Sequence, residues 1–328
     1  MKRILLKSLL ALAAVAAAAG GALAADKEPA YPSRPIRIVV PFTAGSATDI
    51  IARVVSPRMA DRWGRPVVVD NRPSAGGIIA FGIVAEAAPD AHTLLVTGSN
   101  FSGSAALYAG KLPFDPVKDF SGITQFATTP LVLVVGPGLG VKSVKELIAL
   151  AQEKKGQLNF ASTGLGSGPH YGAELFKLAA GIGAVHVPYR GSPETLTDVM
   201  SGRVHFLLSP VLAASPLVRS GRVVALGVTT PYRAQALPDV PTIAEAGLPG
   251  FVYQGWYGML TQGRTPRKTV NLLSEEVGKI LDMPEVRERI AKQGAAAQRS
   301  SPEAFDKLVR DEIVTRTRVW KAAGVKIE

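Results

Sequence analysis

The chain has 328 residues, of which 47% are hydrophobic and 19% are charged, with no cysteine and a formal net charge of +11. The lack of cysteine excludes disulfides, a thiol nucleophile, thiolate metal ligands and a lipid-modified cysteine. Because the basic residues are spread thinly and not interleaved with aromatic residues, the positive charge predicts a surface that attracts small anions, not a nucleic-acid interface.

The N-terminus has the pattern of a secretory signal peptide. Lys2, Arg3 and Lys7 precede an apolar run over residues 9–19, which is about half as long as a membrane-spanning helix. Small residues follow, and we expect cleavage near Ala24. The mature chain is then predicted to be a soluble protein of the periplasm.

Apolar strand-like runs alternate with amphipathic helical stretches, which is typical of an α/β protein with mostly parallel sheets. In the first unit we expect strands at 35–41, 66–69 and 92–97 and helices at 48–63 and 76–87. A second unit begins near Thr129, with strands at 131–135, 158–161, 184–188, 204–209 and 223–228 and helices at 144–153 and 170–180. A strand at 252–260 would return the chain to the first unit, followed by helices at 268–281, 284–293 and 302–323.

Three predicted turns lead from the end of a strand into the start of a helix, at residues 43–48, 74–77 and 162–167. They are rich in Gly, Ser, Thr and Ala and contain no basic side chain, yet a helix N-terminus can bind a carboxylate with backbone N–H groups alone. Open α/β sheets bind ligands at this edge. We therefore predict a site for a small organic anion there. The predicted ligand-binding residues are Thr43, Ala44, Gly45, Ser46, Gly76, Gly77, Ser99, Asn100, Ser162, Thr163, Gly164, Ser167, His170, Tyr189, Gly191 and Ser209.

Catalytic and cofactor chemistry is not predicted. An exported serine hydrolase using Ser167 or Ser99 is an alternative, but the sequence lacks the Gly-x-Ser-x-Gly elbow and a base with an orienting acid at a recognisable spacing. The glycines at 136–140 do not have dinucleotide-binding spacing, so no cofactor is expected. The chain's few histidines lack metal-ligand spacing, so no metal is expected either. The aromatic group Phe251, Tyr253, Trp256 and Tyr257 is expected either to line a pocket or to pack the hinge between the units, and we favour the hinge.

Several segments, in the same order along nearly the whole mature chain, resemble the Bug-type extracytoplasmic solute receptors, the binding components of tripartite tricarboxylate transporters. The matching segments lie at 31–37, 41–42, 49–53, 67–73, 75–77, 112–120, 143–147, 187–192 and 236–247. Two positions depart from the family pattern. Ser46 replaces the second of two consecutive glycines, and His205 replaces an acidic residue, which puts the identity of the ligand in doubt.

The resemblance implies a periplasmic-binding-protein fold, with two α/β domains joined by a two-strand hinge and a ligand cleft between them. The first domain would comprise residues 25–128 and 251–328, the second residues 129–250, and residues 1–24 would be the signal peptide. The implied protein is a monomeric receptor, not an enzyme, that captures a dicarboxylate, a tricarboxylate, an acidic amino acid or an aromatic carboxylate. It would deliver this ligand to inner-membrane transporter subunits, or alternatively report its presence to a signalling membrane protein.

Overall fold

The computed structural model describes residues 31–292 and 294–325. Residues from Arg34 onward form one compact unit, to which all the elements below belong. The predicted signal peptide and its cleavage site near Ala24 lie outside the described residues. No helix in these two described ranges is both long and apolar enough to cross a bilayer.

The first of two sheets combines strands from both ends of the chain. Its strands are β1 (Ile36–Val40), β2 (Val67–Asn71), β3 (Thr93–Gly98), β4 (Phe120–Thr129), β10 (Gly255–Gln262) and β11 (Ala296–Ala297). They lie in the order β11-β4-β10-β3-β1-β2. β1 pairs in parallel with β2 and β3, whereas β10 pairs antiparallel with β3 and β4. The short apolar runs at residues 38–40 of β1 and 94–96 of β3 suit strands that are covered on both faces.

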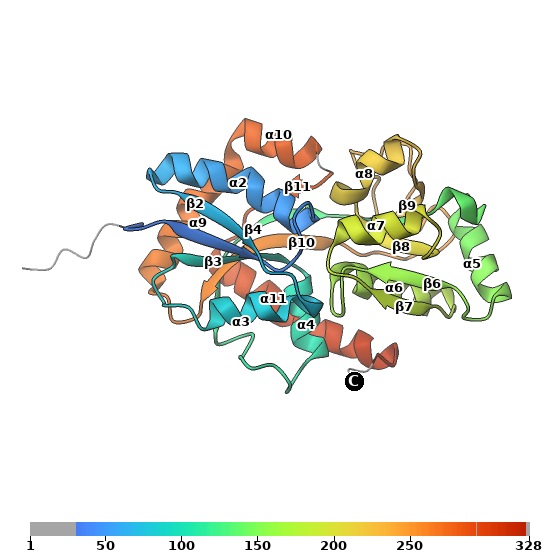
Figure 1. The fold of residues 1–328 in the computed structure, drawn as a ribbon, viewed down its shortest axis with the longest axis horizontal. Coiled ribbons are helices and arrows are strands. Elements are labelled where there is room, and N and C mark those ends of the chain that lie inside the picture. The colour runs from blue at the N-terminus through green and yellow to red at the C-terminus, as the bar shows by residue number, and fades with distance from the viewer. Residues whose placement is uncertain (1–30, 293, 326–328) are drawn as a thin grey trace, which may run out of the picture. The chain divides into compact units, whose positions relative to one another are not determined.

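Helices cover both faces of this sheet. They are α2 (Ala47–Trp63), α3 (Ile78–Ala85), α4 (Asn100–Leu107), α9 (Arg267–Asp282), α10 (Pro284–Lys292) and α11 (Pro302–Ala322), with the 3-10 turn η1 (Ala75–Gly77) before α3. Figure 1 shows α2 and α10 on one side and α3, α4 and α11 on the other. On the latter side, Phe81, Phe101 and Phe305 form a buried cluster with Val39 and Leu95 of the sheet. We call this sheet and its helices the first lobe.

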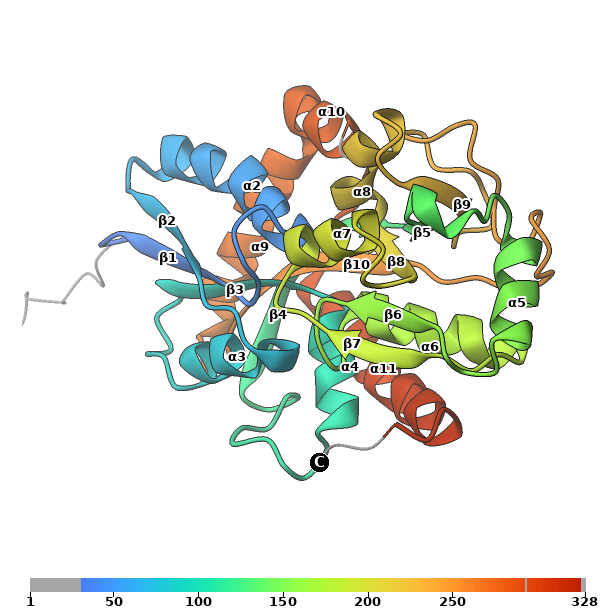
Figure 2. The ribbon, with the colours of Figure 1, turned by 45° about the vertical axis from the view of Figure 1, so that its right-hand side comes forward.

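The second sheet is built from the middle of the chain. Its strands are β5 (Leu131–Val135), β6 (Asn159–Ser162), β7 (Val185–Pro188), β8 (Phe206–Pro210) and β9 (Val224–Val228), in the order β7-β6-β8-β5-β9. Its helices are α5 (Val144–Glu153), α6 (Gly168–Ala180), α7 (Ser192–Met200) and α8 (Val211–Arg219). α5 and α6 pack in one apolar core and α7 and α8 in another, on opposite faces of the sheet (Figure 2). We call this sheet and its helices the second lobe.

The chain crosses between the lobes at neighbouring positions. β4 continues into β5 through Pro130, and Gly255 at the start of β10 pairs with Thr129 at the end of β4. Beside this crossing, the Tyr253 N–H donates to the Thr229 carbonyl (2.8 Å). The two lobes and their paired crossing strands agree with the fold class predicted from the sequence.

α11 connects the lobes a third time. This 21-residue helix packs Phe305 and Val309 into the core of the first lobe, whereas Trp320, near its other end, packs into the core of the second. A helix of this length spans about 30 Å, which is enough to reach across both. The C-terminal helix is therefore shared between the lobes.

The helix α4 and the strands β4 and β11 of the first lobe were not predicted, and α4 and β4 show why. α4 is rich in Ser and Gly, which are poor helix formers, so its sequence resembles a loop. β4 contains Gly122 and several polar residues and lacks a continuous apolar run. Both form because they pack against α11 and β10, segments more than 100 residues away.

Candidate functional site

A narrow cavity lies between the two lobes, at the carboxyl ends of β1, β3, β6 and β8. Its volume is about 40 Å³, the space of a few water molecules. The first lobe and its crossing segments contribute Phe42, Ser46, Ala47, Thr48, Gly98, Ser99, Asn100, Thr129, Tyr253, Gly255, Trp256 and Tyr257. The second lobe contributes Leu131, Thr163, Gly168, Pro169, Ser192 and Pro210.

The start of α2 presents backbone donors to this cavity. Ser46 is the N-cap, and the first backbone hydrogen bond of the helix runs from Ile50 N–H to the Ser46 carbonyl. The N–H groups of Ala47 and Thr48 precede that bond, so the helix itself provides no acceptor for them. Both residues line the cavity, where a ligand oxygen could accept from these groups.

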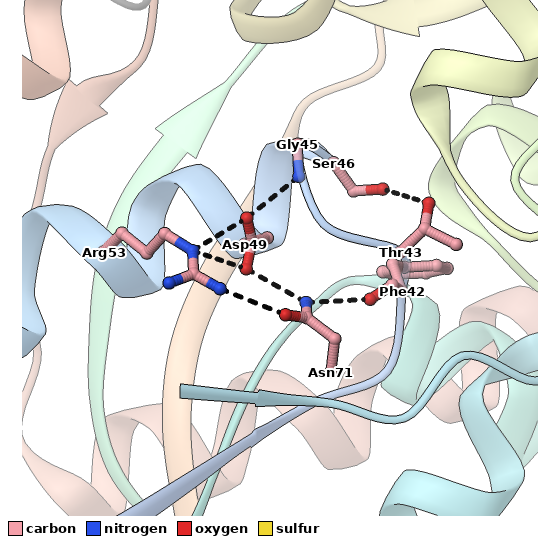
Figure 3. Close-up of polar contacts among 7 residues, drawn as sticks. All are labelled: Phe42, Thr43, Gly45, Ser46, Asp49, Arg53 and Asn71. Atoms are coloured by element: carbon pink, nitrogen blue, oxygen red, sulfur yellow. Dashed lines mark hydrogen bonds and ion pairs between the residues drawn. The ribbon is translucent and has the colours of Figure 1, made fainter. Parts of the chain in front are cut away.

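Asp49 holds the turn before α2 in shape (Figure 3). Its carboxylate accepts from Gly45 N–H (2.9 Å), Asn71 Nδ2 (2.9 Å) and Arg53 Nε (3.0 Å). Burial raises the pKa of Asp49, but the hydrogen bonds from these three residues and the charge of Arg53 outweigh it, so the pKa lies below its ordinary value. Asp49 thus stays ionised, and its charge is paired with Arg53 outside the cavity.

The start of α4 adds side-chain donors. The Oδ1 atom of Asn100 accepts from Thr97 Oγ1 and Gly98 N–H, both at 3.0 Å, which fixes the orientation of the amide. Its Nδ2 atom is buried and has no hydrogen-bond partner among the described residues. The Ser99 hydroxyl accepts from Trp256 N–H (3.4 Å) and lies 3.2 Å from the Tyr253 hydroxyl.

In the second lobe, the turn at residues 162–167 brings Thr163 and the start of α6 to the cavity. His170 lies behind this turn: its Nδ1 accepts from Gly166 N–H (3.2 Å), and its ring stacks on His186 with centroids 3.9 Å apart. His186 in turn contacts Ser162 Oγ (2.5 Å). Burial lowers the pKa of His170 to about 2 and that of His186 to about 4, so both rings are neutral at neutral pH.

The lobes touch across the mouth of the cavity. Thr43 Oγ1 donates to Glu194 Oε2 (3.3 Å), and Ser46 Oγ accepts from Ser192 N–H (3.4 Å). At another contact between the lobes, a Cβ atom added to Gly103 would lie 1.9 Å from the Gly166 carbonyl oxygen. Such a contact between backbones requires glycine at position 103. The structure therefore represents a closed arrangement of the lobes.

Of the sixteen predicted ligand-binding residues, the structure places Ser46, Ser99, Asn100 and Thr163 on the cavity wall. Eight others shape the surrounding turns and contacts: Thr43, Ala44, Gly45, Gly164, Ser162, Ser167, His170 and Gly191. Four lie away from the cavity wall: Gly76, Gly77, Tyr189 and Ser209. A Cβ on Gly76 would meet Leu165 and Ser104, and the Tyr189 hydroxyl donates to Asp198 (2.7 Å).

The aromatic residues follow the alternative that was less favoured. Tyr253, Trp256 and Tyr257 line the cavity, whereas Phe251 lies off the cavity wall, in the core of the second lobe. Three aromatic residues within five positions on a returning strand were the available signal. His205, the second departure from the family pattern, lies beside Asn159 in the second lobe and is not on the cavity wall.

The cavity wall carries no Lys, Arg, Asp or Glu side chain among the described residues. Five helices have their N-terminal ends at this wall: α2 at Ser46, α4 at Ser99, α6 at Gly168, α7 at Ser192 and α8 at Pro210. Each such end carries a partial positive charge. No group of three His, Asp or Glu residues within the described part of the chain could hold a metal ion. The wall suits a small anion held by amides and hydroxyls.

Within the described residues, neither of the serines considered for catalysis forms a hydrogen bond with a basic side chain. The Ser99 hydroxyl contacts Tyr253, and the Ser167 hydroxyl accepts from the His170 backbone N–H (3.2 Å), not from its ring. The Ser162–His186 pair lies in the second lobe, with Ser162 buried and His186 half-buried, and does not line the cavity.

Comparison with known proteins places the chain in a family. Residues 51–325 match the family model of the tripartite tricarboxylate transporter family receptor. Protein BugT of Bordetella pertussis is 34% identical over 325 residues, which cover 98% of each chain.

Solved structures share the fold. The R. palustris protein Rpa4515 with adipate has 33% identity and a TM-score of 0.86, over 90% of this chain and 99% of that one. MatC from Rhodopseudomonas palustris with bound malate has 32% identity and a TM-score of 0.83, over 88% and 99%. Together with the family match, this agreement confirms the predicted two-domain fold and a receptor rather than an enzyme. The chain therefore belongs to the tripartite tricarboxylate transporter receptor family, as a Bug-type solute-binding receptor.

Proposed function

We propose that this receptor closes its two lobes on a small organic carboxylate and delivers it to the membrane subunits of a tripartite transporter. The observation that carries the ligand class is the cavity wall, where the N-terminal ends of helices and hydroxyl groups converge and no described residue contributes a charged side chain. Amide and hydroxyl donors suit a carboxylate, whereas phosphate, with its higher charge, usually recruits Arg or Lys.

Two related receptors support the same ligand class, since one was solved with adipate and the other with malate. The proposal includes export to the periplasm, because a receptor of this kind must meet its ligand outside the inner membrane. It also places the domain boundaries near residues 129 and 250, where the chain passes between the two sheets.

A thermal-shift screen tests the ligand class. Succinate, malate, adipate, citrate and terephthalate would be compared with sugars, phosphate esters and the amides of the same acids. A ligand that binds only the folded state adds about 2.7 kcal/mol at a hundredfold excess over its Kd, which raises the melting temperature by several degrees. We expect shifts with the acids and none with their amides. A largest shift with a sugar or a phosphate ester would contradict the proposal.

A further inference from the structure

Trp320 lies where three helices from the two lobes meet. It is near the C-terminal end of α11, which packs here against α4 of the first lobe and α6 of the second (Figure 2). Only 3% of its surface is exposed, so its indole N–H needs an acceptor inside the protein. That acceptor is the carbonyl oxygen of Gly103 on α4, at 3.1 Å. The hydrogen bond ties Trp320 to the first lobe.

The ring of Trp320 packs against the second lobe. Its centroid lies 4.8 Å from that of the His170 ring and 5.3 Å from that of the Tyr171 ring, both in the first turn of α6. His170 in turn accepts from Gly166 N–H through Nδ1 (3.2 Å). Gly166 belongs to the turn at residues 162–167, so the Trp320 ring supports a side chain that holds this turn.

These contacts close a ring around a meeting point of the lobes. Trp320 is bonded to Gly103, Gly103 touches Gly166, Gly166 is bonded to His170, and the His170 ring packs on Trp320. Trp320 itself is not on the cavity wall, but Thr163, in the same turn as Gly166, is. A change at Trp320 would therefore reach the wall through the turn, without any contact between Trp320 and the ligand.

We propose that Trp320 is a positioning residue for ligand binding, which holds the turn at residues 162–167 against α4 and so fixes Thr163 on the cavity wall. This inference rests on the ligand binding proposed above. An indole suits this role because it offers a donor at one edge and an apolar face to the His170 ring. Phenylalanine would offer the face without the donor.

Trp320→Phe tests the inference, because it keeps an aromatic ring beside His170 and removes the N–H that binds Gly103. Affinity would be measured by calorimetry, with the tightest-binding acid of the thermal-shift panel as the probe. We expect binding to weaken about twofold to tenfold, as for one lost hydrogen bond. Amide hydrogen exchange at residues 163–167 of the ligand-free variant should be faster than in wild type, while exchange in α3 stays the same.

Val309→Ala is the matched control. Val309 is buried on the same helix, but its contacts lie in the core of the first lobe. This variant should melt at a lower temperature than wild type, since it loses buried apolar atoms, and should bind the acid with wild-type affinity. The control separates a general loss of stability from the loss of a positioned turn.

Wild-type affinity in Trp320→Phe, or unchanged exchange at residues 163–167, would overturn the inference. An equal loss of affinity in Val309→Ala would do the same. Should Trp320→Phe fail to melt cooperatively, the benzothiophene analogue of tryptophan at position 320 keeps the shape of the indole without its N–H, and the same two measurements decide. If wild type binds none of the acids, the proposed function fails and this inference with it. If wild type binds but Trp320→Phe binds equally well, only this inference fails.

Discussion

Gly103 offers the sharpest test that binding requires the closed arrangement. It lies inside α4, where alanine would normally be favoured by about 0.5–1 kcal/mol. In the closed structure, however, the added Cβ would lie 1.9 Å from the Gly166 carbonyl oxygen in the second lobe. Backbone atoms cannot move aside cheaply, and overpacking of this kind costs about 1–3 kcal/mol. Because this overpacking raises the free energy of the closed state, we expect Gly103→Ala to weaken ligand binding about 5-fold to 150-fold.

The assay is calorimetric titration with the tightest-binding acid, together with a melting curve of the ligand-free protein. Gly82→Ala is the matched control, because Gly82 is also a helix glycine but its added Cβ would meet no atom within 4 Å. That variant should bind as wild type does. If Gly103→Ala bound within twofold of wild type, the close approach of Gly103 to Gly166 would not be part of the ligand-bound state, and the reasoning would be refuted.

Three further predictions concern the turns around the cavity. Ser46→Ala removes the acceptor of Ser192 N–H across the cleft, so we expect ligand binding to weaken about twofold to tenfold. The melting temperature of the ligand-free protein should not change. Equal affinity of variant and wild type in titrations would contradict this prediction. Asp49→Asn should lower the free energy of unfolding at neutral pH, as measured by urea unfolding. Because the pKa of Asp49 is lowered in the native state, its stabilising contribution is present above pH 3.8 and is lost on acidification, so the difference between wild type and variant should shrink below about pH 4. A difference in unfolding free energy that does not change with pH would exclude this role. The pKa of His186 is lowered to about 4 in the native state, so the unfolded chain takes up a proton below pH 6.5 while the native state does not. Stability should therefore fall from pH 6.5 toward pH 4, and less steeply in His186→Gln. The same slope in both proteins would argue against a neutral His186 in the native state.

The sequence alone determined the fold class, and it located the turns that follow strands. Apolar runs and small polar turns are local signals, so the turns at 43–48 and 162–167 could be recognised without knowing their neighbours. Both reach the cavity in the structure, through Ser46 and Thr163. The resemblance to receptors of known type likewise rested on short segments in order along the chain.

The tertiary structure alone decided which strand ends meet. Gly76 and Gly77 follow β2, which is at the edge of its sheet, and neither lines the cavity. Tyr189 and Gly191 follow β7, also an edge strand, and lie off the cavity wall, although Ser192, the next residue, lines it. The position of a strand within a sheet depends on pairing between distant segments, which a local pattern does not encode. For the same reason the sequence could not decide whether Tyr253, Trp256 and Tyr257 line a pocket or pack the hinge. They reach it because β10 pairs between β3 and β4, more than 100 residues away along the chain.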